Sequence, residues 1–360
     1  MGHPLERLKL YAPNVHTGGG LVLLRELLSA WPQQVALHAW LDARSRVHLD
    51  LPPLAIVEWV RPRIASRMRA EWTLHRSCSA EDTILCFHGL PPVLSSRSRI
   101  EVFLQNVIYL GNVPLSDFEW RVRQRLRFEQ LLSRWRRRQV ARYWVQTPSM
   151  ARALRDWCGS ETADDLRIEM LPFMPTIARG PETREHAVDY DFLYVADGTP
   201  LKNHRQLVEA WVLLAEAGVR PSLALTLSPR DSKLQSWIEE RSAQHGLRIH
   251  HLGTLPHAAV LALYGRVKAL VYPSLGESFG LPLLEAQASS CPILASELDF
   301  VRDVCQPAQS FDPLSAVSIA RAVRRFLAIP ENIIQPADGA AFLKELGSVS
   351  GGRGKHPASP

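Results

Sequence analysis

Residues 269–296 read ALVYPSLGESFGLPLLEAQASSCPILAS, and this stretch decides the fold. Its apolar run Leu270–Tyr272 predicts a buried strand. A loop with two glycines follows, and the segment from Pro282 to about Ser290 predicts a helix, because proline suits the first helical turn. The next Cys-Pro pair ends that helix, and a new strand begins at Ile293. Strand, loop, helix and strand in this order predict an α/β fold.

The junction between this strand and this helix suits a phosphate group. Unpaired backbone N–H groups point out of the sheet edge there, at the positive end of a helix dipole. Two carboxylates flank the junction, Glu277 in the loop and Glu285 about one turn into the helix. A carboxylate beside a phosphate is repelled unless it has another task, such as accepting hydrogen bonds from hydroxyls. A ligand with a diphosphate and vicinal hydroxyls meets both demands, and a nucleotide sugar is such a ligand.

The segment Glu277-Ser-Phe-Gly-Leu-Pro-Leu-Leu-Glu285 resembles the motif of retaining glycosyltransferases of the family 4 type. The Tyr-Pro-Ser before it and the Cys-Pro-Ile-Leu-Ala-Ser after it also match. The resemblance runs from about residue 8 to about residue 328, and the predicted strand Val102–Asn106 ends like those of lipopolysaccharide-type members. It implies an α/β fold of GT-B architecture, with two Rossmann-like, doubly wound domains facing a cleft. An ordinary helix start with acidic residues in its first turn is the alternative.

The chain of 360 residues is too long for one ordinary core and fits two domains. The resemblance predicts an N-terminal Rossmann-like acceptor domain over residues 1–172 and a nucleotide-sugar-binding domain over residues 191–330. A linker is predicted at residues 173–190, which are rich in proline and charge without periodicity. Residues 331–360 are predicted to form an atypical, partly disordered tail, rich in glycine, proline and serine.

The composition narrows the class of protein. No apolar stretch reaches the roughly 18 residues that span a bilayer, and the N-terminus lacks a signal-peptide core, so a cytoplasmic location is predicted. Five cysteines without a C-x-x-C pair and thirteen scattered histidines favour reduced thiols and no metal site. The net charge of +6 favours anionic partners.

Two loops of the N-terminal half are candidates for the ligand site. The predicted strand Leu8–Tyr11 runs into a triple glycine, an arrangement that lets the backbone approach a ligand. The resemblance places Gly19 and Gly20 at the donor, whereas a plain flexible turn is the alternative. His88 follows the predicted strand Thr83–Phe87, at the end where open α/β sheets bind ligands. The resemblance implies that His88 faces the donor sugar, and a histidine hydrogen-bonded within its loop is the equally weighted alternative.

Lys202 is the candidate cation of the C-terminal half. It lies at a predicted helix N-terminus, where a point charge and helix-end N–H groups together suit a diphosphate. Members of the resembling family usually also carry an arginine several residues earlier, just after the strand. This chain has Ala196-Asp197 there, so the second phosphate ligand is left unassigned.

The resemblance also implies roles for the motif residues. Glu277 would accept hydrogen bonds from hydroxyls of the transferred sugar, and we predict it, with His88, as catalytic. Glu285 would accept the ribose hydroxyls. The remaining donor-binding residues are expected to be Ser278, Phe279, Gly280 and Leu281, the last three through their backbone N–H groups. No metal and no other cofactor is expected, because lysine and helix ends take over the charge of the leaving diphosphate.

A basic stretch from Trp120 to Arg138 interleaves arginines with tryptophan and leucine. The pattern predicts an amphipathic helix of the kind that lies on anionic membrane surfaces. A solvated helix that covers one face of the N-terminal sheet is the alternative. Nucleic acid is not an expected partner, because no known binding module accompanies the charge. From this stretch we expect the protein to bind peripherally to the inner face of the plasma membrane.

The sequence therefore predicts a retaining glycosyltransferase. It would move a sugar from a nucleotide-sugar donor to a glycan or lipid-linked acceptor, in surface polysaccharide or lipopolysaccharide synthesis. Two alternatives remain: a nucleotide-sugar epimerase of the same architecture, and a non-catalytic nucleotide-sugar-binding protein. The sequence identifies neither the sugar and base of the donor nor the acceptor.

Overall fold

A computed structural model describes residues 4–94, 97–111, 113–159, 167–177, 188–331, 336 and 338–344 of the chain. By its contacts the chain divides into two units, residues 1–323 and residues 324–360. The first unit contains every strand of the described residues. Most of the predicted tail, and residues 178–187 of the predicted linker, lie outside the described residues.

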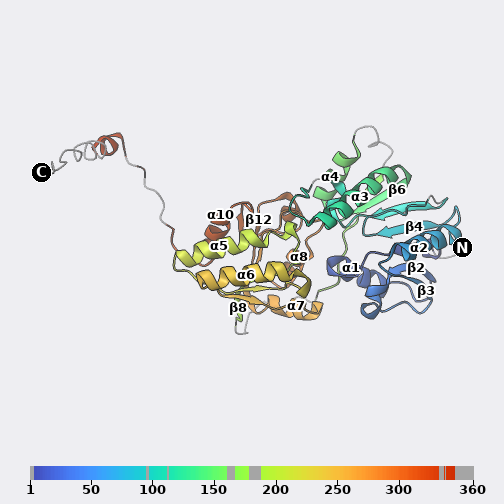
Figure 1. Ribbon diagram of the computed structural model, residues 1–360, viewed down its shortest axis with the longest axis horizontal. Helices are drawn as coiled ribbons and strands as arrows, with labels where there is room; N and C mark the ends of the chain where they lie inside the picture. Colours follow the sequence, from blue (N-terminus) through green and yellow to red (C-terminus); the bar gives the residue numbers. More distant parts are fainter. Residues whose placement is uncertain are drawn as a thin grey trace. The chain divides into compact units, whose positions relative to one another are not determined.

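A seven-stranded parallel sheet occupies the N-terminal half of the first unit (Figure 1). Its strand order is β3-β2-β1-β4-β5-β6-β7, so the order reverses between β1 and β4. Ligands of open α/β sheets bind at the carboxyl ends of the strands beside such a reversal. The strands are β1 (Leu8–Ala12), β2 (Leu37–Asp42), β3 (Ala55–Val60), β4 (Thr83–Phe87), β5 (Arg99–Phe103), β6 (Val140–Val145) and β7 (Arg167–Met170).

A second parallel sheet follows with the order β10-β9-β8-β11-β12-β13. Its order reverses between β8 and β11, and β11 is the strand predicted from the deciding stretch. The strands are β8 (Tyr190–Tyr194), β9 (Leu223–Leu225), β10 (Ile249–His251), β11 (Val267–Tyr272), β12 (Ile293–Ser296) and β13 (Gln309–Phe311). The predicted α/β fold with two Rossmann-like domains is confirmed, whereas the domain boundaries at residues 172, 190 and 330 stay predictions.

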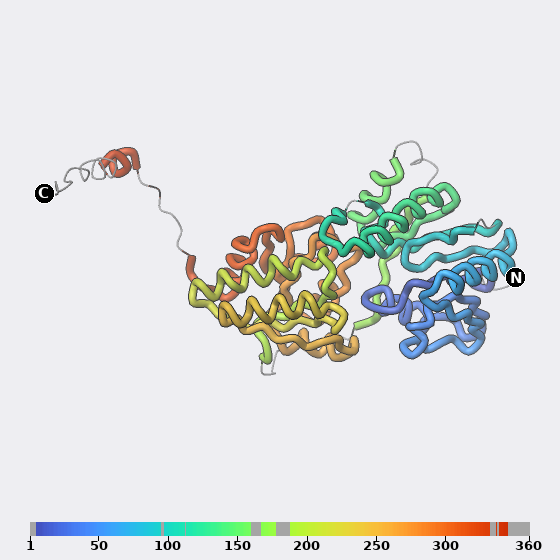
Figure 2. The backbone as a smooth tube through the Cα atoms, viewed as in Figure 1, coloured from blue at the N-terminus to red at the C-terminus, as the bar shows by residue number. Residues whose placement is uncertain are grey.

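Helices connect most of the parallel strands, although only the 3₁₀ turn η2 (Ala43–His48) lies between β2 and β3, and the described residues between β4 and β5 contain no helix. Figure 2 traces this path in colour from blue to red. The helix predicted from Pro282 is present as α8. The helices are α1 (Gly18–Ser29), α2 (Ile64–Ser77), α3 (Trp120–Arg136), α4 (Pro148–Cys158), α5 (His204–Glu216), α6 (Ser232–His245), α7 (His257–Tyr264), α8 (Leu281–Ala288), α9 (Asp299–Arg302) and α10 (Ala316–Phe326). Short 3₁₀ turns join them, among them η3 (Val107–Leu110), η5 (Pro200–Lys202) and η6 (Pro229–Asp231).

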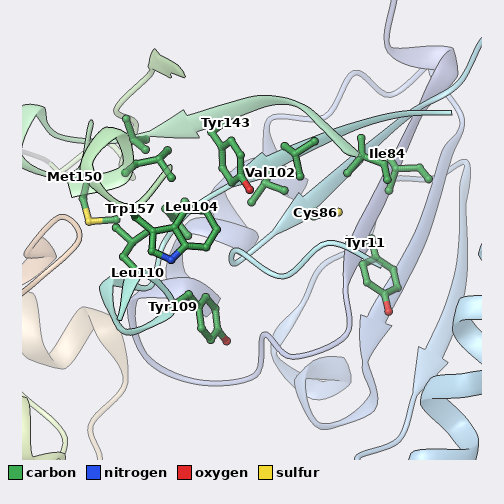
Figure 3. Packing of buried hydrophobic residues seen from close by; sticks show 14 of the residues in the cluster. Tyr11, Ile84, Cys86, Val102, Leu104, Tyr109, Leu110, Tyr143, Met150 and Trp157 are labelled. Atoms are coloured by element: carbon green, nitrogen blue, oxygen red, sulfur yellow. The ribbon is translucent and has the colours of Figure 1, made fainter. Parts of the chain in front are cut away.

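Both faces of the first sheet are buried. Successive side chains of a strand point to opposite faces, and in β1 Leu10 and Ala12 join one hydrophobic cluster whereas Tyr11 joins another. Figure 3 shows the cluster around Tyr11, in which Ile84, Cys86, Val102 and Tyr143 are labelled. The other cluster also takes in two motif residues of the second half, Phe279 and Leu281.

One predicted strand is displaced along the chain. The strand predicted at Val102–Asn106 is β5, which begins at Arg99 and ends at Phe103. It begins earlier because it pairs with β4 from Arg99 onward. It ends earlier because the side chain of Asn106 accepts a hydrogen bond from the N–H of Ile108 and caps η3. Gln105 therefore lies beyond the strand end, at the sheet edge.

His204, at the start of α5, should make folding sensitive to acid. Burial lowers the pKa of His204 to about 3, so the folded protein holds this imidazole neutral. The unfolded chain takes up the proton below about pH 6.5, so unfolding becomes easier as the pH falls from there toward 3. The expected loss is about 1.4 kcal/mol of unfolding free energy per pH unit, or about 2 kcal/mol by pH 5.

Urea unfolding of wild type and His204→Phe at about pH 7.5 and about pH 5 measures this effect. Phenylalanine keeps the ring that packs 4.8 Å from Tyr194, measured between centroids, but cannot titrate. In His204→Phe we expect most of the acid-induced drop in unfolding free energy to disappear. In His48→Asn, a change at an exposed histidine, we expect the drop to remain. An unchanged pH dependence in His204→Phe would contradict the assignment.

Candidate functional site

The loop after β11 positions Glu277 at the carboxyl end of the second sheet. Its Oε1 atom accepts hydrogen bonds from the hydroxyls of Tyr272, at 2.8 Å, and Ser274, at 2.7 Å. The same oxygen pairs with Lys202 Nζ at 2.5 Å. Oε2 has no hydrogen-bond partner among the described residues, so it is the oxygen left for a ligand. Sequence reasoning noted the Tyr-Pro-Ser segment but missed that two of its side chains orient Glu277.

Lys202 reaches Glu277 from the loop after β8, 75 positions earlier in the chain. Asn203, in the left-handed region at φ 56°, fixes this loop by donating to the carbonyls of Pro273 and Pro313. Burial disfavours the charged form of Lys202, but attraction to Glu277 and Asp197 outweighs it and raises the pKa of Lys202. The structure thus brings together the predicted cation and the first predicted carboxylate.

Glu285, the second motif carboxylate, is buried and held by two residues that sequence reasoning missed. His257 Nε2 lies 2.8 Å from its Oε1, and the Tyr264 hydroxyl donates to Oε2 at 3.0 Å. Burial, followed by the charge of Glu285, raises the pKa of Tyr264 well above its ordinary value, so the phenol stays protonated and keeps donating. No local pattern in the sequence pairs these residues, because they meet only when α7 and α8 pack together.

The turn into α8 depends on Gly280. It adopts a φ of +74°, which favours glycine, and α8 begins directly after it. Pro282 has no N–H group and the N–H of Leu283 donates to the carbonyl of Gly280, so the N–H groups that can face a ligand are those before Pro282. On either side of Gly280, Phe279 and Leu281 are buried in a core cluster of the first sheet. The glycines predicted to form a loop after β1 lie instead in the first turn of α1, which begins at Gly18. A Cβ on Gly19 would lie 3.1 Å from Leu281 Cδ1, so this turn of α1 directly faces the turn into α8.

Ser278 ties the motif loop to the first sheet. Its hydroxyl donates to the carbonyl of Gln105, after β5, at 2.8 Å. Its own carbonyl accepts from the hydroxyl of Thr147, after β6, at 3.3 Å. The carboxyl ends of strands from both sheets therefore meet around residues 277–281.

A cluster of buried polar atoms adjoins this contact on the side of the first sheet. His88 Nδ1 and both amide atoms of Gln105 are buried and make no well-aligned hydrogen bond within the described residues, although the two side chains lie close enough to interact with each other. A Cβ on Gly20 would lie 3.3 Å from His88 Nδ1 and from Gln105 Oε1, so glycine lets the start of α1 approach these side chains closely. Burial lowers the pKa of His88, which therefore stays neutral. Such orphan atoms fit hydroxyl groups of a ligand, since an amide both donates and accepts.

Arg230 supplies a second cation near the place where the family arginine is missing. Arg230 lies in η6, after β9. The neighbouring Asp231 packs tightly against the loop after β8, because a Cβ on Gly198 would come within 2.6 Å of the carboxylate of Asp231. Burial is the main cause of the lowered pKa of His16, in the loop after β1, and the charge of Arg230 contributes to that shift. Arg230 therefore lies near both loops.

Two features, a metal site and a membrane-spanning helix, are absent from the described residues. These residues contain no group of three or more His, Cys, Asp or Glu side chains arranged to hold a metal ion. None of their helices combines the length and the apolar character needed to cross a bilayer.

Known proteins resemble this chain in sequence and in fold. A family model described as "Glycosyl transferases group 1" matches residues 181–337. O-antigen chain mannosyltransferase B of Escherichia coli is 33% identical over 120 residues, which cover 31% of this chain and 30% of that protein. Serotype-specific mannosyltransferase WbdA of Escherichia coli is 28% identical over 148 residues, 40% of this chain and 18% of that protein.

Among solved structures, Anabaena HepE in complex with UDP and glucose covers 89% of either chain, with 14% identity and a TM-score of 0.66. At this identity the likeness shows the fold alone, and the fold is the predicted GT-B architecture. The chain spans less than a third of the length of the two mannosyltransferases it matches. Residues 181–337 thus resemble the glycosyl transferases of group 1.

Proposed function

We propose that this protein is a retaining glycosyltransferase that moves a sugar from a nucleotide-sugar donor to a glycan or lipid-linked acceptor. The observation that carries the proposal is Glu277, one oxygen of which is held by Tyr272, Ser274 and Lys202 while the other is left for a ligand. This carboxylate lies beside the N-terminus of α8, a place that suits a phosphate. A nucleotide sugar presents both groups that such a site would bind.

The donor would bind at the carboxyl ends of β8 and β11. Its diphosphate would pair with Lys202 in place of Glu277. It would also accept hydrogen bonds from the backbone N–H groups of Phe279, Gly280 and Leu281, and Ser278 would hold their loop in position. Arg230 would provide the second positive charge. Glu285 would accept hydrogen bonds from the ribose hydroxyls, through the same carboxylate oxygens that contact His257 and Tyr264.

The sugar would lie between Glu277 and the polar atoms of His88 and Gln105 at the first sheet. His88 and Gln105 offer three buried polar atoms to its hydroxyls, and Gly19 and Gly20 let the backbone of α1 approach closely. The positively charged groups around the diphosphate would stabilise the leaving group, so the proposal needs no metal or other cofactor.

The similar proteins support this class of reaction and this type of pathway. The two mannosyltransferases are named for O-antigen chain and serotype synthesis, and the Anabaena protein holds UDP and glucose. We infer by this similarity that the protein acts in surface polysaccharide or lipopolysaccharide assembly. The donor sugar and base stay open.

Incubation with labelled nucleotide sugars, with and without a lipid or glycan extract, tests the proposal against its alternatives. A transferase moves the label into the extract and releases the nucleotide. An epimerase would return an altered sugar nucleotide without an acceptor, and a binding protein would hold the donor without turnover. Either of the last two results would overturn the proposal.

We also propose that α3 lies on an anionic membrane surface. Four large apolar residues on its outer side are about two-thirds exposed: Trp120, Phe128, Leu131 and Trp135. They recur at helical spacing and are flanked by exposed arginines, the arrangement of an interfacial helix. Arg136 is an exception, because it is buried and donates to the carbonyls of Pro92 and Leu94.

Helix α2 extends this surface. It lies beside α3, since Arg67 and Glu129, as well as Glu71 and Arg136, are close enough to interact electrostatically. Its own outer side exposes three more apolar residues, Ile64, Met68 and Trp72. The location at the inner face of the plasma membrane stays a prediction.

Flotation with vesicles of phosphatidylcholine and phosphatidylglycerol measures the membrane contact. The triple variant Trp120→Ser, Leu131→Ser, Trp135→Ser is expected to lose at least about tenfold in bound fraction, because three partly inserted side chains are removed. A control triple variant at exposed apolar positions outside α2 and α3, Leu54→Ser with Leu314→Ser and Val317→Ser, should float like wild type. Equal flotation of both variants would discard the membrane surface.

A further inference from the structure

A hollow of about 580 Å³ lies between α3, α4 and η3, outside the site described above. Its lining contains Leu110, Gly111, Arg127, Gln130, Leu131, Arg134, Asp156 and Trp157. Leu110 and Trp157 belong to the buried cluster of Figure 3, so the hollow rests on a rigid apolar base. Gln130 is fixed by donating to the carbonyl of Ile108, at 2.8 Å.

The two arginines of the lining are not engaged by the part of the chain that the structure describes. Arg127 and Arg134 lie two turns apart on one side of α3, and both side chains are exposed. Neither forms an ion pair or hydrogen bond with any described residue, whereas Arg123 donates to the carbonyls of Ser116 and Phe118. Two unengaged guanidinium groups on one hollow are suited to an anion with several acceptor oxygens.

The net charge of the lining residues indicates how much negative charge a bound anion would carry. Two guanidinium groups and the carboxylate of Asp156 leave one net positive charge. A phosphodiester, with a single negative charge, balances this lining, whereas a diphosphate would bring Asp156 next to further negative charge. A singly charged phosphate group is therefore the better fit.

The apolar residues next to the hollow indicate which kind of molecule carries that phosphate. Leu131 lines the hollow and also belongs to the exposed apolar side of α3, next to Phe128 and Trp135. An apolar chain attached to the phosphate would therefore continue along the surface that we assign to the membrane. We propose that this hollow binds the phosphodiester headgroup of a bilayer phospholipid. The inference rests on the proposed membrane contact and is independent of the donor site.

Isothermal titration of the full chain with short-chain dihexanoyl phosphatidylglycerol tests the site, with inorganic phosphate as the second probe. The variant Arg127→Gln with Arg134→Gln is expected to weaken lipid binding by about tenfold or more, because both charge-assisted contacts are lost. The matched control is Arg121→Gln with Arg138→Gln, which removes the same charge from exposed positions outside the hollow. We expect the control to stay within about twofold of wild type, and inorganic phosphate to bind more weakly than the lipid.

Three results would overturn the inference. Equal weakening by both double variants would mean attraction to the overall charge of α3. Phosphate binding as tight as lipid binding would mean a free-phosphate site, and no lipid binding by wild type would remove the site altogether. Circular dichroism checks that the variants fold. Stabilisation of both double variants by a nucleotide diphosphate reports on the donor site separately, so failure here and failure of the transferase proposal are distinguishable.

Discussion

Glu277→Gln is expected to lower sugar transfer by about 10²–10³-fold, the usual cost of losing one preorganised electrostatic group. Glutamine keeps the size of the side chain and an oxygen that can accept from Tyr272 and Ser274. It loses the negative charge that pairs with Lys202 and that would accept hydrogen bonds from the sugar. The effect should therefore fall on kcat, with nucleotide diphosphate binding changed by less than about tenfold.

Initial rates with labelled donor measure this change. Glu297→Gln is a matched control, because Glu297 follows β12 at the same sheet edge and pairs with Arg302 instead. The control should stay within about twofold of wild type. Unimpaired transfer by Glu277→Gln would remove Glu277 from the mechanism.

Lys202→Met is expected to weaken binding of a nucleotide diphosphate by about 10- to 100-fold, since a hydrogen bond to a charged group contributes about 1.5–3 kcal/mol. The change also leaves the largely buried Glu277 without its cation, so the free energy of unfolding should fall by about 1–3 kcal/mol. Adding Glu277→Gln should restore part of that stability, because the unpaired charge is then gone.

Titration with UDP and GDP in parallel, together with urea unfolding, measures both effects. Lys268→Met is the control, because it breaks another lysine–carboxylate pair of the same sheet, that with Asp191. It should lose stability but keep nucleotide binding. Wild-type affinity in Lys202→Met would exclude Lys202 from the donor site.

The local structure of the site could be predicted from sequence, because it depends on neighbours in the chain. The strand ending at Tyr272, the glycine-rich loop and the helix after Gly280 all follow from periodicity and backbone preferences. Lys202 could be placed at a helix start for the same reason. In each case the deciding residues lie within about one or two turns of one another.

The contacts that complete the site could not be predicted in this way. The pairing of Lys202 with Glu277, and of His257 and Tyr264 with Glu285, depends on the strand order of the sheet and on the packing of α7 against α8. Gln105 was missed because β5 ends at Phe103, earlier than the apolar run indicates. The inward direction of Arg136 likewise depends on the carbonyls of a loop 42 and 44 positions away.

The most direct test of the central claim is a crystal structure of the protein with bound UDP or GDP. The account predicts that the diphosphate contacts Lys202 Nζ and the N–H groups at the start of α8, with Glu277 released from the lysine. A diphosphate bound elsewhere, with the pair of Lys202 and Glu277 intact, would contradict it.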